Sequence, residues 1–301
     1  MTIAAAPHSL LNTAMDLPLP TATLAPAPVR VLRPALQTAP IVFASAHSGR
    51  LYPPGFVAAA RLDALRLRRS EDCFVDELFA AAPECGMPLA CATFPRAYCD
   101  ANREAWELDP AMFDDTLPPW VNTASPRVGA GLGTIARVVS SGEPIYRDKL
   151  RFAEAESRVH DCWQPFHDAV RGLVEETAAR FGGCLLIDCH SMPASALPAR
   201  GATDIVLGDA HGTACAAGLV QVVEQALLGL GLSVRRNDPY AGGYITRHYG
   251  RPGKRMHALQ IEINRGLYMD EARIDYAPEF DAFRRLVTRF IGVLAGISLA
   301  I

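Results

Sequence analysis

Two histidines and a pair of neighbouring acids have the types and positions that a metal-dependent enzyme needs. His47 and His190 each follow a predicted strand, and Glu71 and Asp72 stand at the start of a predicted helix. Two neutral imidazoles and one carboxylate form a three-ligand zinc set that leaves a fourth position for water, the catalytic arrangement. The alternative is that the acids cap a helix and the histidines form ordinary hydrogen bonds near the surface.

Two further carboxylates accompany this set. Asp188 precedes His190 by two residues, so both side chains would point to one face of a strand. Asp188 would then either orient His190 from behind a metal or act as an ordinary buried acceptor. Glu262 lies in a predicted strand at 259–264, on the face opposite Ile261 and Ile263. Burying a carboxylate is costly, so that face either meets solvent at a sheet edge or lines a cleft in which Glu262 acts as a general base.

Other side chains offer planar donors that suit carboxylate recognition. The alternative for each is a surface ion pair. The planar donors are Arg96, Asn102, Arg103 and Arg265.

The glycine-rich segment 129–133 follows no predicted strand and is not followed by Gly-Lys-Ser/Thr, so we expect a flexible loop and not a phosphate-binding loop. The chain contains no G-x-S-x-G motif, the usual sign of a serine hydrolase of the α/β class.

The elements that would position these residues alternate between strand and helix. Residues 1–38 are rich in Ala, Pro and Leu without a regular pattern, and we expect an irregular arm followed by one domain over 39–301. The alternation predicts an α/β sheet between helical layers. Strands are predicted at 39–46, 89–94, 184–189, 205–207 and 259–264, and helices at 70–82, at 213–230, at 280–301 and, in two segments interrupted by Pro165, at 146–181.

Composition excludes several classes of protein. The 301 residues carry 29 Lys and Arg against 32 Asp and Glu, a formal net charge of −3, with no clustered basic stripe, so nucleic acid is not an expected partner. The longest apolar run, within 290–301, is shorter than the roughly 20 residues that span a membrane. The N-terminus has no cationic segment and is broken by Pro7, which does not resemble a secretory signal, so we expect a cytoplasmic protein. The eight cysteines form no C-x-x-C pair and are expected to be mostly buried.

Seven segments, in order, resemble the N-formylglutamate amidohydrolase family over about residues 30 to 290. The resemblance implies a fold similar to that of zinc carboxypeptidases and acylase-type hydrolases: three α/β/α layers around a central mixed, mostly parallel sheet. The segments are SAHSGRLYP (45–53), SED-x-x-VDEL (70–78), R-x-x-x-D-x-N-R (96–103), DCHSMP (188–193), DIVLGDAHGT (204–213), GGYITRHYG (242–250) and LQIEINRGLYMDE (259–271).

The resemblance also implies one zinc ion, or another divalent metal, bound by His47, Asp72 and His190. In the carboxypeptidase pattern the acidic ligand stands three residues after the first histidine, where this chain has Arg50. The acidic ligand must therefore come from Glu71 or Asp72, and Asp72 matches the family spacing.

Roles for the remaining residues follow from the same resemblance. Glu262 would be the general base and Arg96 the arginine that steadies the carbonyl oxygen. The substrate-binding residues would be Asn102 and Arg103, which grip a carboxylate, then Tyr244, Thr246 and Arg247 on a glycine-rich loop, and Arg265, with Arg247 or Arg265 a candidate for the side-chain carboxylate of the substrate.

The function implied is metal-dependent hydrolysis of N-formyl-L-glutamate to formate and L-glutamate. The expected partner is accordingly a small anionic N-acyl amino acid. Two alternatives remain open. The same site would act on another N-acyl acidic amino acid or a small peptide, because a carboxylate-binding pocket discriminates weakly over one methylene. The chain would otherwise be a non-catalytic member that binds an acidic ligand.

Overall fold

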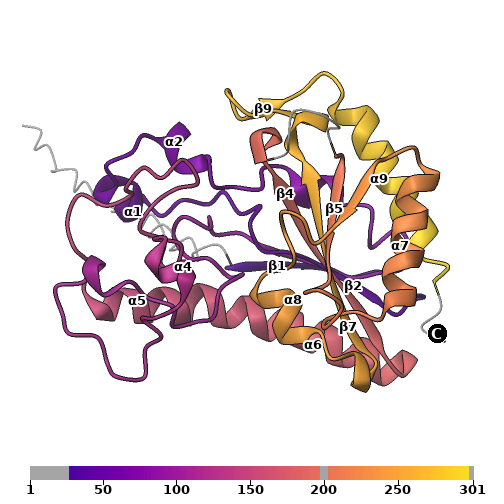
Figure 1. Cartoon of the computed structure of the whole chain (residues 1–301), viewed down its shortest axis with the longest axis horizontal. Helices are drawn as coiled ribbons and strands as arrows, with labels where there is room; N and C mark the ends of the chain where they lie inside the picture. The colour runs from indigo at the N-terminus through magenta and orange to yellow at the C-terminus, as the bar shows by residue number, and fades with distance from the viewer. Residues whose placement is uncertain (1–26, 197–202, 298–301) are drawn as a thin grey trace, which may run out of the picture.

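A seven-stranded sheet runs through the centre of the structure (Figure 1). The computed structural model describes residues 27–196 and 203–297, and the strand order is β1-β3-β2-β4-β7-β5-β6. Four neighbouring strands are parallel, β1 and β5 join them antiparallel, and β6 pairs parallel with β5, so the predicted mixed, mostly parallel sheet is confirmed. The parallel strands are β2 (Ile41–Ser45), β3 (Leu89–Ala92), β4 (Cys184–Met192) and β7 (Met256–Asn264), and the others are β1 (Val29–Leu32), β5 (Ile205–Gly208) and β6 (Val234–Arg236).

Helices cover both faces of this sheet, which confirms the α/β/α layering (Figure 1). Successive residues of a strand point to opposite faces. Phe43 and Ile187 therefore pack with α3 (Val75–Leu78), α7 (Ala217–Gly229) and α9 (Phe280–Leu294). Val42 and Leu186 pack on the other side with α6 (Gln164–Phe181) and α8 (Tyr244–Tyr249). The smaller elements are α1 (Pro54–Ala59), α2 (Ala64–Arg68), α4 (Pro126–Gly129), α5 (Phe152–Arg158), β8 (Met269–Asp270) and β9 (Asp275–Tyr276).

The helix predicted over 70–82 is wrong in its first turns. Only Val75–Leu78 is α-helical, and Phe74 before it has a left-handed backbone with φ of 65°. Tertiary contacts hold the preceding residues in turns. The Ser70 hydroxyl does not cap α3 but accepts a hydrogen bond from Ser140 N–H, and Asp72 N–H donates to the carbonyl of His47 at 3.0 Å.

Other boundaries differ more modestly. The long helical region does not break at Pro165: a π-helical turn, Val159–Trp163, joins α5 to α6, and Pro165 is the second residue of α6. β4 extends to Met192, so His190 lies within the strand and not after it. The sequence did not predict β1, which falls within the expected arm.

The last helix ends at Leu294, earlier than predicted. Two expectations fall partly outside the described residues: the arm over 1–26 and the end of the chain over 298–301. The cysteines are buried as expected, apart from the partly exposed Cys85. In the part of the chain that the structure describes, no helix combines the length and apolarity needed to cross a membrane.

Candidate active site

The candidate site lies where the parallel strands end. His47 follows β2 by two residues, and His190 near the end of β4 pairs in register with Glu262 on β7. Ligands of open α/β sheets bind outside the carboxyl ends of the strands. Because β2, β4 and β7 are parallel neighbours, residues more than 200 positions apart meet at one edge of the sheet.

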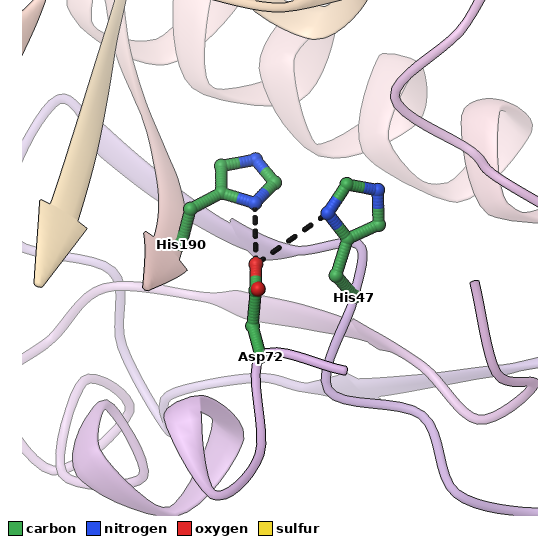
Figure 2. A group of neighbouring side chains, drawn as sticks. All are labelled: His47, Asp72 and His190. Carbon is green, nitrogen blue, oxygen red and sulfur yellow. Dashed lines mark hydrogen bonds and ion pairs between the residues drawn. The ribbon is translucent and has the colours of Figure 1, made fainter. Parts of the chain in front are cut away.

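Asp72 completes a compact group with the two histidines (Figure 2). Its Oδ2 lies 2.8 Å from Nδ1 of His190 and 3.4 Å from Nδ1 of His47. All three residues are buried, and one ligand atom from each lies within 4.8 Å of the others. This group could hold a metal ion, and it consists of the three residues that the resemblance implied.

Glu71 faces elsewhere although it is adjacent to Asp72. Its Oε1 accepts a hydrogen bond from the Tyr52 hydroxyl at 2.6 Å, and both carboxylate oxygens lie 3.2 Å from Nε of Arg68. The Cys73 thiol also donates to it. Glu71 is therefore a partner in a separate buried ion pair, and Asp72 is the acid that faces the histidines.

Another carboxylate lies close to Nε2 of each histidine ring. Nε2 of His47 lies 2.6 Å from Oδ1 of Asp100, and Nε2 of His190 lies 2.8 Å from Oδ1 of Asp188. Asp100, by accepting the Nε2 proton of His47, leaves the Nδ1 lone pair of that ring facing Asp72. At His190 the Asn102 amide also reaches Nε2, and Nδ1 forms a hydrogen bond with Asp72. Nδ1 of His47 is buried without a hydrogen-bond partner, a costly state that a cation between these atoms would relieve. The donor set thus fits a divalent ion of the zinc type.

Asp100 is a site residue that the sequence analysis missed. Besides His47, it accepts a hydrogen bond from Arg96 at 2.8 Å and from the backbone of Asn102 at 2.9 Å, and Arg103 lies 3.6 Å away. Burial alone would raise the pKa of Asp100, but Arg103, Arg96 and His47 hold it well below its usual range. The sequence did contain a signal for Asp100, which stands in the R-x-x-x-D-x-N-R segment beside the predicted site residues Asn102 and Arg103.

Arg265 supports the group formed by His47, Asp72 and His190. Its guanidinium donates to Oδ1 of Asp72 at 2.9 Å, to the Ser191 hydroxyl at 3.2 Å and to the carbonyl of Arg69 at 3.4 Å. Burial acts against the ionised form of Asp72, but the neighbouring His190 and His47 keep its pKa well below the usual range. Arg265 therefore positions Asp72, and its nitrogens are already engaged.

Glu262 lies on an interior strand, so its polar face lines a cavity and does not form a solvated sheet edge. Gln260 donates a hydrogen bond to Oε1 of Glu262 at 2.9 Å, and its own oxygen accepts from Gly243 N–H at 2.9 Å. Burial, opposed by the charge of His190, raises the pKa of Glu262 to about 7. A carboxylate with a pKa near neutrality suits proton transfer.

The residues of the site surround a cavity of about 690 Å³. Asn102 lines it, but its amide is engaged: Oδ1 accepts from Ile245 N–H at 2.8 Å, and Nδ2 lies 2.9 Å from Nε2 of His190. Gly243 makes room for that amide, because a Cβ there would lie 2.4 Å from it. Arg103, next in the chain, donates to the carbonyls of Leu132 and Asn102. Asn102 thus braces the wall behind the histidines.

The remaining predicted site residues divide between the cavity and its surroundings. Arg96 and Arg247 line the cavity. Tyr244 and Thr246, on the same helix as Arg247, do not: the Tyr244 ring stacks on His248 with centroids 4.8 Å apart, and Thr246 is fully buried. Of the three residues predicted on this loop, only Arg247 faces the cavity.

Comparisons with known proteins agree with this geometry. A family model described as N-formylglutamate amidohydrolase matches residues 39–269. Curated relatives named N-formylglutamate deformylase from Pseudomonas putida and Pseudomonas aeruginosa are 27% and 29% identical, over 77% and 83% of this chain and 82% and 90% of theirs.

Solved structures show the same relationship. A crystal structure of an N-formylglutamate amidohydrolase from Ralstonia eutropha JMP134 superposes with a TM-score of 0.84 at 38% identity, over 89% of this chain and 97% of the other. A gene product of Agrobacterium tumefaciens shares the fold, with a TM-score of 0.58 at 19% identity over 88% of this chain and 94% of its own.

Proposed function

This chain belongs to the N-formylglutamate amidohydrolase family, and on that basis we propose that it hydrolyses N-formyl-L-glutamate to formate and L-glutamate. The observation that carries the proposal is the pairing of His190 with Glu262 across β4 and β7, beside His47 and Asp72 in one cavity. A metal-binding group next to a carboxylate that can exchange a proton near neutral pH is what amide hydrolysis by water requires.

The metal in this proposal is one zinc ion, with another divalent metal as the alternative. Nδ1 of His47, Nδ1 of His190 and the carboxylate of Asp72 would hold it, and two imidazoles with one carboxylate are a catalytic zinc set. Such an ion supplies Lewis acidity, which makes water more acidic and polarises a carbonyl oxygen.

The protein itself supplies proton transfer and charge stabilisation. Gln260 holds Oε1 of Glu262, so Oε2 is the oxygen that takes a proton from the attacking water and passes it to the departing amine nitrogen. Arg96 is fixed to Asp100 through one nitrogen, and its side chain, 22% exposed, faces the cavity. Its other nitrogens would stabilise the negative oxygen of the tetrahedral intermediate.

The substrate would bind as an anion. Arg103 is buried in the cavity wall and is the candidate for the α-carboxylate. Asn102 contributes by bracing His190 and the first turn of α8, and Arg247 adds positive charge at the exposed rim. Tyr244 and Thr246 would act indirectly, by packing the helix that carries Arg247.

The test is release of formate from N-formyl-L-glutamate by the zinc-loaded protein, compared with release of the acyl group from N-acetyl- and N-succinyl-L-glutamate. We expect the formyl compound to be hydrolysed fastest. Equal rates on all three would contradict the formylglutamate assignment and favour a broader deacylase. Binding of these compounds without turnover would favour a non-catalytic protein that binds acidic ligands.

A further inference from the structure

We propose that Arg127 holds the side-chain carboxylate of the substrate. This inference rests on the proposed function and adds a residue from α4 (Pro126–Gly129), just before the glycine-rich segment 129–133 that was expected to be a flexible loop. Arg127 lines the same cavity as His47, Asp72 and Glu262. Nothing in the chemistry of the metal-binding group requires an arginine there.

The charges of the cavity wall single out Arg127 and one other arginine. Five guanidiniums line the cavity against three carboxylates, those of Asp72, Asp100 and Glu262. Arg96 and Arg103 lie against Asp100, and Arg265 lies against Asp72. Across residues 27–196 and 203–297, Arg127 and Arg247 form neither an ion pair nor a hydrogen bond through their guanidiniums. Arg127 and Arg247 are thus the cavity-lining guanidiniums that no carboxylate among these residues neutralises, and either could pair with a carboxylate of the substrate. The five arginines are Arg96, Arg103, Arg127, Arg247 and Arg265.

The contacts of each arginine with the metal-binding group indicate which of the two substrate carboxylates it would hold. Arg103 lies 3.6 Å from Asp100, and Asp100 grips His47, so Arg103 is close to the reacting amide. Among the described residues, Arg127 forms no hydrogen bond or ion pair with Arg103, Asp100 or His47. The α-carboxylate is attached to the carbon that bears the amide nitrogen, whereas the side-chain carboxylate is two methylenes further away. Arg103 therefore suits the α-carboxylate and Arg127 the distal one.

Arg103 lies near two other positively charged side chains of the wall. Burial lowers the pKa of Arg103 to about 10, and the charges of Arg96 and Arg127 act in the same direction against Asp100. A substrate carboxylate placed between Arg103 and Arg127 would relieve this repulsion. Arg247 differs in that it is exposed, whereas Arg127 is half-buried, and a less hydrated guanidinium pairs more strongly with a carboxylate.

The local structure holds Arg127 in place. The Ser125 hydroxyl accepts a hydrogen bond from Val128 N–H at 3.2 Å, and the Arg127 carbonyl accepts from Leu132 N–H at 2.8 Å. Arg137 in the same region points to Asp109, at 2.8 Å, and does not line the cavity. Arg137 is therefore a matched control, because it shares the segment and the charge but not the cavity.

The experiment compares Arg127→Gln, Arg127→Lys and Arg137→Gln with the parent protein on three substrates. These are N-formyl-L-glutamate, N-formyl-L-glutamine, which lacks the side-chain carboxylate, and N-formyl-L-isoglutamine, which lacks the α-carboxylate. Arg127→Gln should raise KM for N-formyl-L-glutamate about 10- to 100-fold, the loss of one charge-assisted hydrogen-bonded pair, with kcat nearly unchanged. It should also abolish the preference for the glutamate over the glutamine compound and keep the preference over isoglutamine. Arg127→Lys should keep part of the preference for the glutamate over the glutamine compound. Arg137→Gln should keep this preference and the preference over isoglutamine.

Several results would overturn the inference. Parent-like selectivity in Arg127→Gln would exclude Arg127 from the subsite, and loss of the preference over isoglutamine instead would exclude the side-chain assignment. If Arg137→Gln also lost the preference for the glutamate over the glutamine compound, removal of any positive charge from this segment would have that effect. Calorimetric binding of L-glutamate and L-glutamine tests Arg127 without turnover. A protein that hydrolyses none of the formyl compounds would refute the proposed function, while its binding preference would still decide the role of Arg127.

Discussion

Nε2 of His47 lies 2.6 Å from Oδ1 of Asp100, and the opposite nitrogen of the same ring faces Asp72 without a hydrogen bond. Asp100 thereby determines which nitrogen of His47 carries the proton. His190 differs: its Nε2 lies near both the Asn102 amide and Asp188, and its Nδ1 forms a hydrogen bond with Asp72 at 2.8 Å. Both rings nevertheless present Nδ1 to Asp72.

Replacing Asp100 by asparagine should weaken metal binding. The amide of Asp100→Asn would present a donor or a weaker acceptor to Nε2 of His47 and disturb its tautomer, and such changes behind a metal ligand typically cost about 10- to 100-fold in affinity. Zinc affinity measured by competition with a chelating dye checks this. Asp109→Asn, which alters an ion pair with Arg137 outside the cavity, is the control and should bind zinc like the parent. Equal affinity in both variants would contradict the proposed role.

Replacing Glu262 by glutamine should remove activity and keep the metal. The amide has nearly the same size but cannot take a proton, so we expect kcat to fall about 100- to 10,000-fold. Formate release and zinc content are measured on the same preparation. A variant that stays zinc-loaded and fully active would refute the assignment of the general base.

Removing the metal should lower both activity and stability. An ion that binds the folded protein alone stabilises it by about 2.7 kcal/mol when its free concentration is 100 times Kd. We expect a chelator to abolish formate release and lower the midpoint of thermal unfolding, and added zinc to restore both. In His47→Gln the response of the midpoint to zinc should be largely lost. If zinc did not change the midpoint of thermal unfolding of the parent protein, this result would argue against a metal at this site.

Folding stability should fall in mild acid because of His167. Its Nε2 lies 2.8 Å from the carbonyl oxygen of Ala101, and burial lowers its pKa from 6.5 to about 4. The unfolded chain therefore takes up a proton at this residue as the pH drops below 6.5, and the folded protein does so only near pH 4. The stability contributed by the neutral, buried ring is complete above 6.5 and is lost as the pH falls.

Between pH 7.5 and 4.5 this single group should cost about 2.5 kcal/mol of the free energy of unfolding. Urea unfolding of the parent and of His167→Gln at both pH values isolates the effect. The variant should lose less stability than the parent over this range. Identical pH dependence in the two proteins would show that His167 does not contribute.

The sequence by itself determined the order of the elements and most of the chemistry. The strands around 41–45, 184–192 and 256–264 were predictable because their apolar patterns are local properties of the chain. His47, His190 and Glu262 could be selected because they stand at or near the ends of such strands. The family resemblance then supplied the expected metal, substrate and fold, and the comparisons confirm the family.

Only the tertiary structure decided which neighbouring residue faces the site. Glu71 and Asp72 are adjacent and chemically alike, and the turn at 70–74, held by the His47 carbonyl, points one toward Arg68 and the other toward the histidines. The partners of Asp100 and Arg265 come from segments up to 196 residues away. Such pairings depend on how strands and loops meet in space, and no local pattern in the chain encodes that meeting.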